Sequence, residues 1–384
     1  MTDSNINYGI SRYNNINGVT CYMNSILSIL QQTPIFADYI VTYSFKNVLE
    51  KKYKDKNIET SPLYQLYKLF KISMSNDNFT ITPRTFRDTI TVKDSMWGDQ
   101  QHQDSQEFLT FILGQLENDI MEKVEFIPGR KINYPNMENI PQKNNLLENI
   151  PRKNNLLEKN IIQILATSYW HKFIKNEYSL IKILFTGMTR MTTTCEFCSN
   201  QSNNFDIFQT LQLSVPISTD KNKTFTLDEC FNNYISMEQL DENNKMKCNF
   251  CFLKNKSNKK TMLWKTPKIL IIHIKRFMMN NYGLISQKIT NMVTYPHENF
   301  NINNIIDTMS PEYNTNIKYN LFAVNCHHNI GMFNTLNFGH YTSMVKNRYN
   351  NCWHNYDDGA PIKEITTVEQ LVSPNAYMLF YMKE

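Results

Sequence analysis

The chain has 384 residues, of which 41% are hydrophobic and 12% aromatic, and its formal net charge is +5. This composition is typical of a folded globular protein and excludes a disordered chain, which would be poor in aromatic residues. The positive charge is spread along the chain without one dominant basic run, so we expect no nucleic-acid partner.

The N-terminal residues MTDSNINYG lack the basic start and apolar core of a secretory signal. The longest apolar run, ILIIHI at 269–274, has the length of a strand and falls far short of the roughly 18 residues that span a bilayer. We therefore expect an intracellular, cytoplasmic monomer with no membrane partner, and a nuclear location stays open. In that reducing compartment the 8 cysteines favour metal binding or catalysis over disulfides.

The first expected helix starts at Thr20, which can cap it, and ends before Pro34. Its apolar residues recur at spacings of three and four, which places them on one face: Met23, Ile26, Leu27 and Leu30. A second helix is expected from about Asp104 to about Ile120, with a similar apolar stripe formed by Phe108, Leu109, Ile112 and Leu116.

Residues 128–165 interrupt this pattern. ENIPQKNNLL at 138–147 is followed at once by ENIPRKNNLL at 148–157, and two copies are too few to build a repeat fold. We expect an exposed inserted loop; the alternative is a docking segment for a partner.

Strand patterns dominate the remainder of the chain. They occur in TLQLSVPI at 210–217, KILIIHIKRF at 268–277 and HYTSMVK at 340–346. Helices followed by strands predict an α+β fold.

Cys21 is the first candidate for chemistry. A cysteine in the first turn of a helix lies near the positive end of the helix dipole, which favours the nucleophilic thiolate. It still needs a histidine base oriented by a third group. Taken alone, a cysteine at a helix start is as well explained by packing.

Two Cys-x-x-Cys pairs form the second candidate site. Cys195 and Cys198 make one pair, and Cys248 and Cys251 make the other. Four thiolates close a tetrahedral site of the kind that zinc occupies structurally, with no open position for catalysis. We expect one structural zinc ion per chain. The three other cysteines, Cys230, Cys326 and Cys352, are interpreted as packing residues on a helix (Cys230) and in strands.

A series of segments resembles the ubiquitin-specific proteases in the order that this family has them. The similarity covers nearly the whole chain: GVTCYMNSILSILQQTPIF at 18–36, QHQDSQEFLTFIL at 101–113, FTGMTRMTTTCEFC at 185–198, PKILIIHIKRF at 267–277, YNLFAVNCHH at 319–328, GHYTSMVK at 339–346, WHNYDDGAPIKEI at 353–365 and AYMLFY at 376–381. The resemblance implies a papain-like catalytic domain over 1–384, with a thumb at 8–127, the inserted loop at 128–165, zinc-binding fingers at 180–265 and a palm at 266–384.

The resemblance also implies the roles of individual residues. Cys21 would be the nucleophile, His340 the base and Asp357 the residue that orients the imidazole, while His327 and His328 would be structural. Gly339 would leave room for a substrate backbone.

The flexible tail of ubiquitin, which contains arginine and ends in Gly-Gly, would be held by Asp104 and Glu107 and lined by Tyr341 and Tyr377. Ordinary helix N-terminal acids are the alternative interpretation of Asp104 and Glu107.

The family usually places an asparagine five residues before the nucleophile, where its amide stabilises the oxyanion. This chain has Ile16 at that position, with Asn15 and Asn17 on either side. We favour Asn17 as the oxyanion donor, because it is nearer to Cys21 in the sequence.

The resemblance predicts a thiol-dependent deubiquitinase whose partners are ubiquitin and ubiquitinated proteins. Three alternatives remain: a catalytically weak ubiquitin-binding module, a protease for a ubiquitin-like modifier, and a zinc-ribbon nucleic-acid protein.

Overall fold

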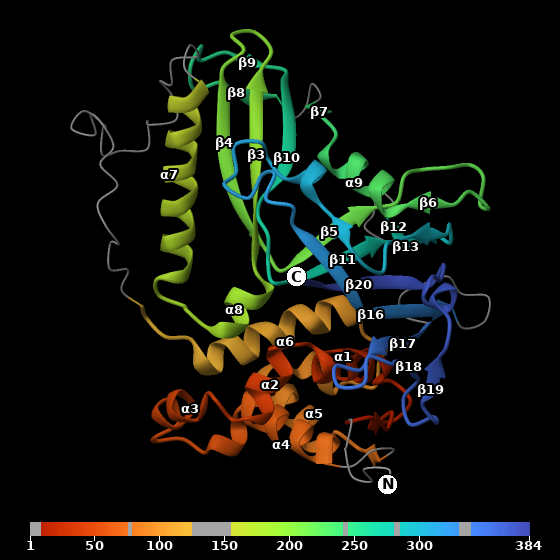
Figure 1. Ribbon diagram of the computed structural model, residues 1–384. Helices are drawn as coiled ribbons and strands as arrows, with labels where there is room; N and C mark the ends of the chain where they lie inside the picture. Colours follow the sequence, from red (N-terminus) through yellow and green to blue (C-terminus); the bar gives the residue numbers. More distant parts are fainter. Residues whose placement is uncertain (1–8, 76–78, 125–154, 241–244, 280–284, 330–338) are drawn as a thin grey trace.

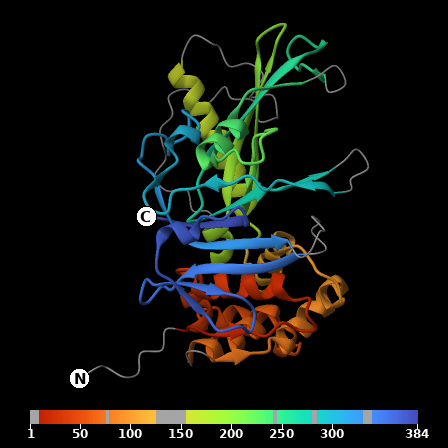
Figure 2. The same cartoon turned by 90° about the vertical axis from the view of Figure 1, so that its right-hand side faces the viewer.

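The computed structural model describes residues 9–75, 79–124, 155–240, 245–279, 285–329 and 339–384. Figure 1 shows three tiers: helices α1 to α6 lie below a long sheet, and the strands β3, β4 and β10 rise above it. The same tiers appear after a quarter turn in Figure 2. This arrangement is the α+β fold that the sequence predicts.

The lower, helical tier corresponds to the expected thumb. Its helices are α1 (Cys21–Gln32), α2 (Phe36–Val41), α3 (Lys46–Lys52), α4 (Pro62–Ser75), α5 (Arg84–Lys93) and α6 (Ser105–Ile120), with a small parallel pair β1 (Arg12–Tyr13) and β2 (Thr80–Ile81).

Helix α6 begins where the sequence predicts, because the Asp104 side chain accepts hydrogen bonds from the backbone N–H groups of Gln106 and Glu107. The expected cap at Thr20 is wrong. Thr20 precedes α1, but its side chain makes no capping bond and instead accepts a hydrogen bond from the Ile16 N–H.

Helix α1 is buried on all sides, although its sequence has an apolar stripe and a polar face. The polar face points to partners inside the protein. Gln31 accepts a hydrogen bond from the Tyr13 hydroxyl, and Ser25 Oγ accepts one from the amide of Asn325 at 3.0 Å. A polar helix face can be buried when each group finds a partner, so α1 forms the centre of the thumb.

The middle tier, the palm, is one sheet with the order β19-β18-β17-β16-β20-β11-β5, and β15 also pairs with β16. All these pairs are antiparallel except β11 with β5. The strands are β5 (Thr210–Ser214), β11 (Ile269–Lys275), β15 (Phe300–Asn301), β16 (Lys318–Asn329), β17 (Gly339–Lys346), β18 (Trp353–Tyr356), β19 (Lys363–Ile365) and β20 (Ala376–Lys383).

The two faces of the palm sheet pack on different cores. Tyr341 and Val345 belong to the core shared with the thumb helices, whereas Met344 belongs to a second core on the other face. Short elements lie around this second core: β6 (Phe225–Thr226), α9 (Leu227–Ile235), β12 (Phe277–Met279), β13 (Ile285–Lys288) and β14 (Val293–Thr294).

The upper tier corresponds to the fingers. Its sheet has the order β4-β3-β10-β7, with a separate pair β8 and β9. The strands are β3 (Gly187–Cys195), β4 (Gln201–Phe208), β7 (Glu238–Gln239), β8 (Met246–Lys247), β9 (Lys254–Asn255) and β10 (Ser257–Lys265). A buried ion pair, Arg190 to Asp307 at 3.0 Å, links this sheet to the segment between the palm strands β15 and β16.

The expected boundaries of the insert and the fingers differ from the structure in two places. Residues 155–165 belong to α7 (Asn155–Ile174) and are therefore not a loop; Ile162 and Ala166 pack on Trp264 of the fingers, and α7 runs beside β4 in Figure 1. Helix α8 (Leu180–Phe185) follows. Strand β5, expected in the fingers, pairs with β11 of the palm. The first 17 residues of the duplication, 138–154, lie outside the described residues.

The remaining strand and packing predictions are confirmed with shifted ends. The strand expected at 340–346 is β17, that at 210–217 ends at Ser214, and that at 268–277 breaks at Arg276 between β11 and β12. Cys230 lies buried in α9 and Cys326 lies buried in β16. Cys352 precedes β18 and is half-buried, so its assignment to a strand is wrong.

We predict that Asn325→Ala lowers the free energy of unfolding by roughly 2–4 kcal/mol, because it removes two buried hydrogen bonds and leaves the buried Ser105 hydroxyl without its acceptor. Asn325 is fully buried; its amide donates to Ser25, and its carbonyl accepts from Ser105 Oγ at 2.8 Å. Chemical denaturation measures the loss. Asn320→Ala on the same strand, where the hydrogen bonds are exposed, is the control and should cost under about 1 kcal/mol. Equal losses in the two variants would contradict the bridging role of Asn325.

Candidate active site and cysteine cluster

Cys21 and His340 meet where the thumb packs on the palm. Cys21 is the first residue of α1 and is buried. His340 is the second residue of β17 and pairs across the sheet with His328. The imidazole Nε2 donates a hydrogen bond to Asp357 Oδ1 at 2.6 Å, which leaves Nδ1 for the thiol.

The electrostatics of His340 favour the charged imidazolium. Hydrogen bonding with the Cys21 thiol, and then with Asp357, raises the pKa of His340 to about 9 against the opposing effect of burial. An imidazolium beside the sulfur stabilises a thiolate, which is the reactive form of a cysteine nucleophile. The structure thus brings the three predicted triad residues together.

A second carboxylate, Asp358, supports the triad and was missed in the sequence. Asp358 adopts a left-handed conformation with φ of 47°. Its Oδ1 accepts a hydrogen bond from Asn24 Nδ2 at 2.7 Å and its Oδ2 one from Asn15 Nδ2 at 2.8 Å. It lies 4.0 Å from His340 Nδ1. The signal was present in Asn24, one helical turn after Cys21, and in the consecutive acids of YDDG.

Asp104 organises two tyrosines beside this centre. The hydroxyls of Tyr341 and Tyr377 both donate to Asp104 Oδ2, while Oδ1 caps α6. Burial, reinforced by the Asp104 charge, raises the pKa of both phenols well above the usual value, so they remain donors. The carboxylate of Asp104 is thus used inside the protein, in line with the alternative interpretation as a helix N-terminal acid.

Glu107 remains available to a ligand. It is exposed, and its side chain makes no hydrogen bond or ion pair with the described part of the chain. Partial desolvation and the neighbouring Asp104 charge raise the pKa of Glu107. A cationic ligand would relieve that repulsion.

Gly339 is required by a contact inside the protein. A Cβ at this position would lie 2.0 Å from Nε2 of His327 and 2.9 Å from the carbonyl oxygen of His328. The space that the sequence assigns to a substrate backbone is therefore filled, on this side, by His327, which is buried and bonded to Lys288. His328 bonds Thr342. Within the described residues neither histidine forms a hydrogen bond with Cys21, which agrees with their structural interpretation.

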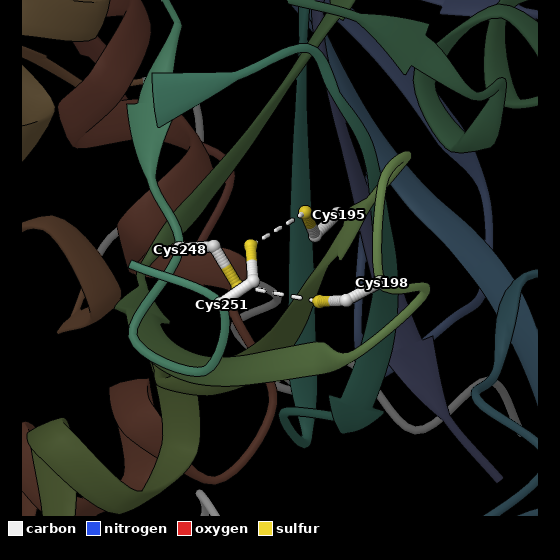
Figure 3. Close-up of side chains that lie close together, drawn as sticks. All are labelled: Cys195, Cys198, Cys248 and Cys251. Carbon is white, nitrogen blue, oxygen red and sulfur yellow. Dashed lines mark hydrogen bonds between the residues drawn. The ribbon is translucent and has the colours of Figure 1, made fainter. Parts of the chain in front are cut away.

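The four cysteines of the Cys-x-x-Cys pairs converge at the end of the fingers sheet (Figure 3). The sulfurs of Cys195 and Cys251 are 3.9 Å apart, those of Cys198 and Cys248 are 3.6 Å apart, and all four lie within 4.8 Å of one another. None of these cysteines is in a disulfide. Tetrahedral bonds of about 2.3 Å to one zinc ion place sulfurs about 3.8 Å apart, so the donor set fits zinc.

The two cysteine loops share one backbone design. In the first, the Cys195 N–H bonds the Asn200 carbonyl and the Ser199 N–H bonds the Cys195 carbonyl; in the second, Cys248 pairs in the same way with Leu253 and Phe252. Ser199 and Phe252, each directly after the second cysteine, have φ of 56° and 59°. N–H groups also reach the sulfurs: the Phe250 N–H lies 3.4 Å from Cys248 Sγ. These donors support thiolate ligands.

The surroundings of the cysteine cluster are more basic than the charge distribution of the whole chain suggests. Lys247 and Lys254 are cross-strand neighbours on β8 and β9, and both are exposed, as are Lys256 and Lys260. The even spread of charge along the sequence is therefore no argument against nucleic-acid binding at this end of the fingers. That the protein has no nucleic-acid partner stays a prediction.

Comparison with known proteins decides the family. The family model described as ubiquitin carboxyl-terminal hydrolase matches residues 13–381. The chain belongs to the ubiquitin carboxyl-terminal hydrolase family.

Relatives span several kinds of organism. The chain is 28% identical over 95% of its length to ubiquitin carboxyl-terminal hydrolase Usp2 of Drosophila melanogaster and to ubiquitin carboxyl-terminal hydrolase 2 of Homo sapiens. It covers 34% and 54% of those longer proteins. A probable ubiquitin carboxyl-terminal hydrolase of Acanthamoeba polyphaga mimivirus is 26% identical, with 98% of this chain and 90% of the viral protein covered.

Solved structures of the yeast SAGA DUB module share the fold. A structure of that module and one of the SAGA DUB module bound to monoubiquitin both give a TM-score of 0.70 at 22% identity, covering 100% of this chain and 70% and 71% of theirs. The likeness extends over all three tiers.

The predicted oxyanion donor of this hydrolase family member, Asn17, lies beside Ile16. Asn17 is exposed, with φ of 56°. Its side chain makes no hydrogen bond with the described residues, so it is free to turn to a ligand. The alternative, Asn15, is engaged: its Oδ1 accepts from the Thr20 N–H at 2.8 Å and its Nδ2 donates to Asp358.

We predict that Asn17→Ala lowers turnover about a hundredfold, the cost of a lost oxyanion donor, and leaves substrate binding unchanged. Thermal stability should fall only slightly, because the side chain has no partner to lose and alanine adds only the strain of a positive φ. Steady-state kinetics and a melting curve measure both. Asn15→Ala is the comparison, and it should lower stability as well, since it removes the bonds to Thr20 and Asp358. Wild-type turnover of Asn17→Ala would remove Asn17 from the mechanism.

Proposed function

We propose that this chain is a deubiquitinase that hydrolyses the isopeptide or peptide bond at the C-terminal glycine of ubiquitin. The observation that carries the proposal is the Cys21–His340–Asp357 arrangement, with the imidazole bonded to Asp357 at 2.6 Å and its pKa raised chiefly by the Cys21 thiol. Its occurrence in a chain of this family, with an intact cysteine, histidine and aspartate, favours catalysis over a binding module.

The reaction follows from the geometry in two stages. The Cys21 thiolate attacks the glycine carbonyl carbon, and the C–N bond breaks as His340 Nδ1–H gives its proton to the departing amine. This leaves a thioester. Water then attacks the same carbon while His340 takes up one of its protons. The C–S bond breaks to give the Cys21 thiolate, and the new carboxylic acid releases the other proton to solvent as the ubiquitin carboxylate.

Asp357 holds the imidazole through both stages. It is half-exposed, and its hydrogen bond fixes Nε2 as a donor, so Nδ1 is the nitrogen that exchanges the proton. Asp358, anchored by Asn15 and Asn24, fixes the loop that carries Asp357 to the start of α1.

Of the two carboxylates predicted to bind the ubiquitin tail, Asp104 and Glu107, only Glu107 is available to do so. The bonds that occupy both oxygens of Asp104 leave it to position Tyr341 and Tyr377. Exposed Glu107 can pair with a tail arginine. The fingers would hold the globular body of ubiquitin, so that affinity comes from a broad surface and specificity from the tail.

We further propose that Cys195, Cys198, Cys248 and Cys251 hold one structural zinc ion per chain. Sulfur separations of 3.6 and 3.9 Å support it, together with the matched cysteine loops. The ion would join the β3–β4 loop to the β8–β9 pair and give the fingers a fixed shape. Reduced thiols are needed for such a site, which supports a cytoplasmic location. No helix in the described part of the chain is long and apolar enough to cross a membrane.

The proposed activity is tested by hydrolysis of ubiquitin carrying a small fluorophore as a C-terminal amide. Wild-type protein should release the fluorophore, and Cys21→Ala should lose turnover by a factor of at least about 10³ with ubiquitin binding retained. Binding without turnover in the wild type would favour the binding-module alternative. Cleavage of another modifier and not of ubiquitin would favour the ubiquitin-like alternative.

We predict an alkaline limit of kcat/KM near pH 9. Because the pKa of His340 is raised to about 9, the proton that the leaving amine needs is present below that pH and is lost above it. Asp357→Ala removes one cause of the raised pKa, so it should lower turnover and move the alkaline limit to lower pH. A pH–rate profile of both proteins measures the shift; an alkaline limit unchanged by Asp357→Ala would contradict this role.

We predict one zinc atom per chain by elemental analysis. Cys248→Ser should lose the metal and lower the melting temperature, since one of four ligands is gone. Cys352→Ser, half-buried and outside the cluster, is the matched control and should keep it. A metal-free wild-type protein with an unchanged melting temperature would contradict the zinc proposal.

A further inference from the structure

A cavity of about 470 Å³ opens beside the catalytic pair, on the far side from the thumb. Its wall includes His340 and Asp357 themselves, and six residues define it here: His340, Thr342, Asn355, Asp357, Glu364 and Gln370. We call it the dyad-side cavity, after the catalytic pair Cys21 and His340. No residue given a role in the formation of the thioester, other than His340 and Asp357, lines this cavity.

The alternation of β17 separates this cavity from the proposed tail site. Tyr341 points to the thumb, where its hydroxyl donates to Asp104. His340, Thr342 and Met344 are alternate residues and face the other way, and all three line the cavity. The His340 side chain both bonds the Cys21 thiol and lines the cavity.

The two parts of the substrate that the scissile bond joins must also lie on different sides of His340. The acyl part, the ubiquitin tail, lies by the proposed function on the side of Asp104 and Glu107. The amine nitrogen must come within hydrogen-bond reach of His340, which protonates it. Because the acyl part occupies the side of Asp104 and Glu107, the rest of the leaving group extends away from that side, and the dyad-side cavity, which His340 and Asp357 line, adjoins His340 there.

We propose that the dyad-side cavity binds the polypeptide segment that carries the modified lysine, and so selects among ubiquitin conjugates. This rests on the proposed deubiquitinase function.

The chemistry of the cavity fits a peptide. Amides (Asn355 and Gln370), a hydroxyl (Thr342) and a carboxylate (Glu364) can bond peptide groups and polar side chains, while Met344 gives an apolar floor for the lysine stem.

The sheet edge supplies a second reason for a polypeptide occupant. Strand β19, which contributes Glu364, is the terminal strand of the palm sheet order. It pairs with β18 on one side, with Lys363 opposite Asn355, and its other edge faces no strand of the described chain. An extended peptide can pair along such an edge while its side chains enter the adjoining cavity.

Two ubiquitin substrates that differ only in the leaving group test the proposal: one carries a small fluorophore, the other a short peptide joined through its lysine side chain. Glu364→Ala removes an exposed wall residue, and Asn355→Phe fills the cavity. Both variants should lower kcat/KM for the lysine-linked peptide by about tenfold and leave the fluorophore substrate at the wild-type value. Glu369→Ala, an exposed glutamate on the neighbouring segment that does not line the cavity, is the matched control and should match the wild type on both substrates.

Other results overturn the proposal in distinct ways. Wild-type rates of Glu364→Ala and Asn355→Phe on both substrates would show that the leaving segment does not enter the cavity. Equal losses on both substrates would show that the wall only supports the triad. A wild-type protein that cleaves neither substrate would instead contradict the proposed function.

Discussion

The amide of Asn325 joins the three parts of the molecule that the active site needs. It donates to Ser25 on α1 and accepts from Ser105 at the start of α6, while its own strand, β16, pairs with β17. Residues 300 positions apart are thereby held in one fixed arrangement. A buried amide with both ends satisfied specifies one geometry, because any shift leaves a polar group unpaired.

The hydrogen bonds of Asn325 also fix the relative positions of the catalytic pair, Cys21 and His340. Cys21 is the first residue of α1, His340 is the second residue of β17, and Asp104 is the N-cap of α6, so each lies at the end of an element fixed by packing. Asp358 adds a second tie, from the loop after β18 back to Asn24 of α1. Residues on such rigid elements keep reacting groups aligned better than residues on free loops. The thumb, which presents the thiolate, and the palm, which presents the base, thus act as one unit.

Under the proposed function, recognition would be distributed over surfaces that lie away from the Cys21 thiol. Glu107 is exposed beside Asp104, the dyad-side cavity lies on the opposite face of β17, and the cysteine cluster lies at the far end of the fingers sheet. Changes in these surfaces can alter which conjugate is cleaved without moving Cys21 or His340. The basic end of the fingers, with Lys247 opposite Lys254, is such a surface, and like charges in register are costly unless an anion or water screens them.

Local patterns in the sequence predict much of this structure. Spacing indicated α1 and α6, alternation indicated β17, and the paired cysteines indicated the cluster, because each is set by residues close in sequence. The ties across the molecule were not predictable in this way. Asn24 and Asn15 on Asp358, Asn325 on Ser105, and His327 against Gly339 depend on long-range packing. The start of α7 at Asn155 could not be predicted, because its first residues belong to a duplicated segment whose composition is typical of a loop. Thr20 does not cap α1, because its hydroxyl accepts a hydrogen bond from the Ile16 N–H.

The role of Cys21 as the nucleophile is tested by mass spectrometry of the protein after reaction with a ubiquitin that carries an electrophile at its C-terminus. Peptide mapping then shows which of the eight cysteines has reacted. The account predicts one adduct, on Cys21, formed quickly by the wild type and slowed when His340 is replaced by alanine. An adduct on another cysteine, or none while ubiquitin is bound, would contradict the assignment of this centre.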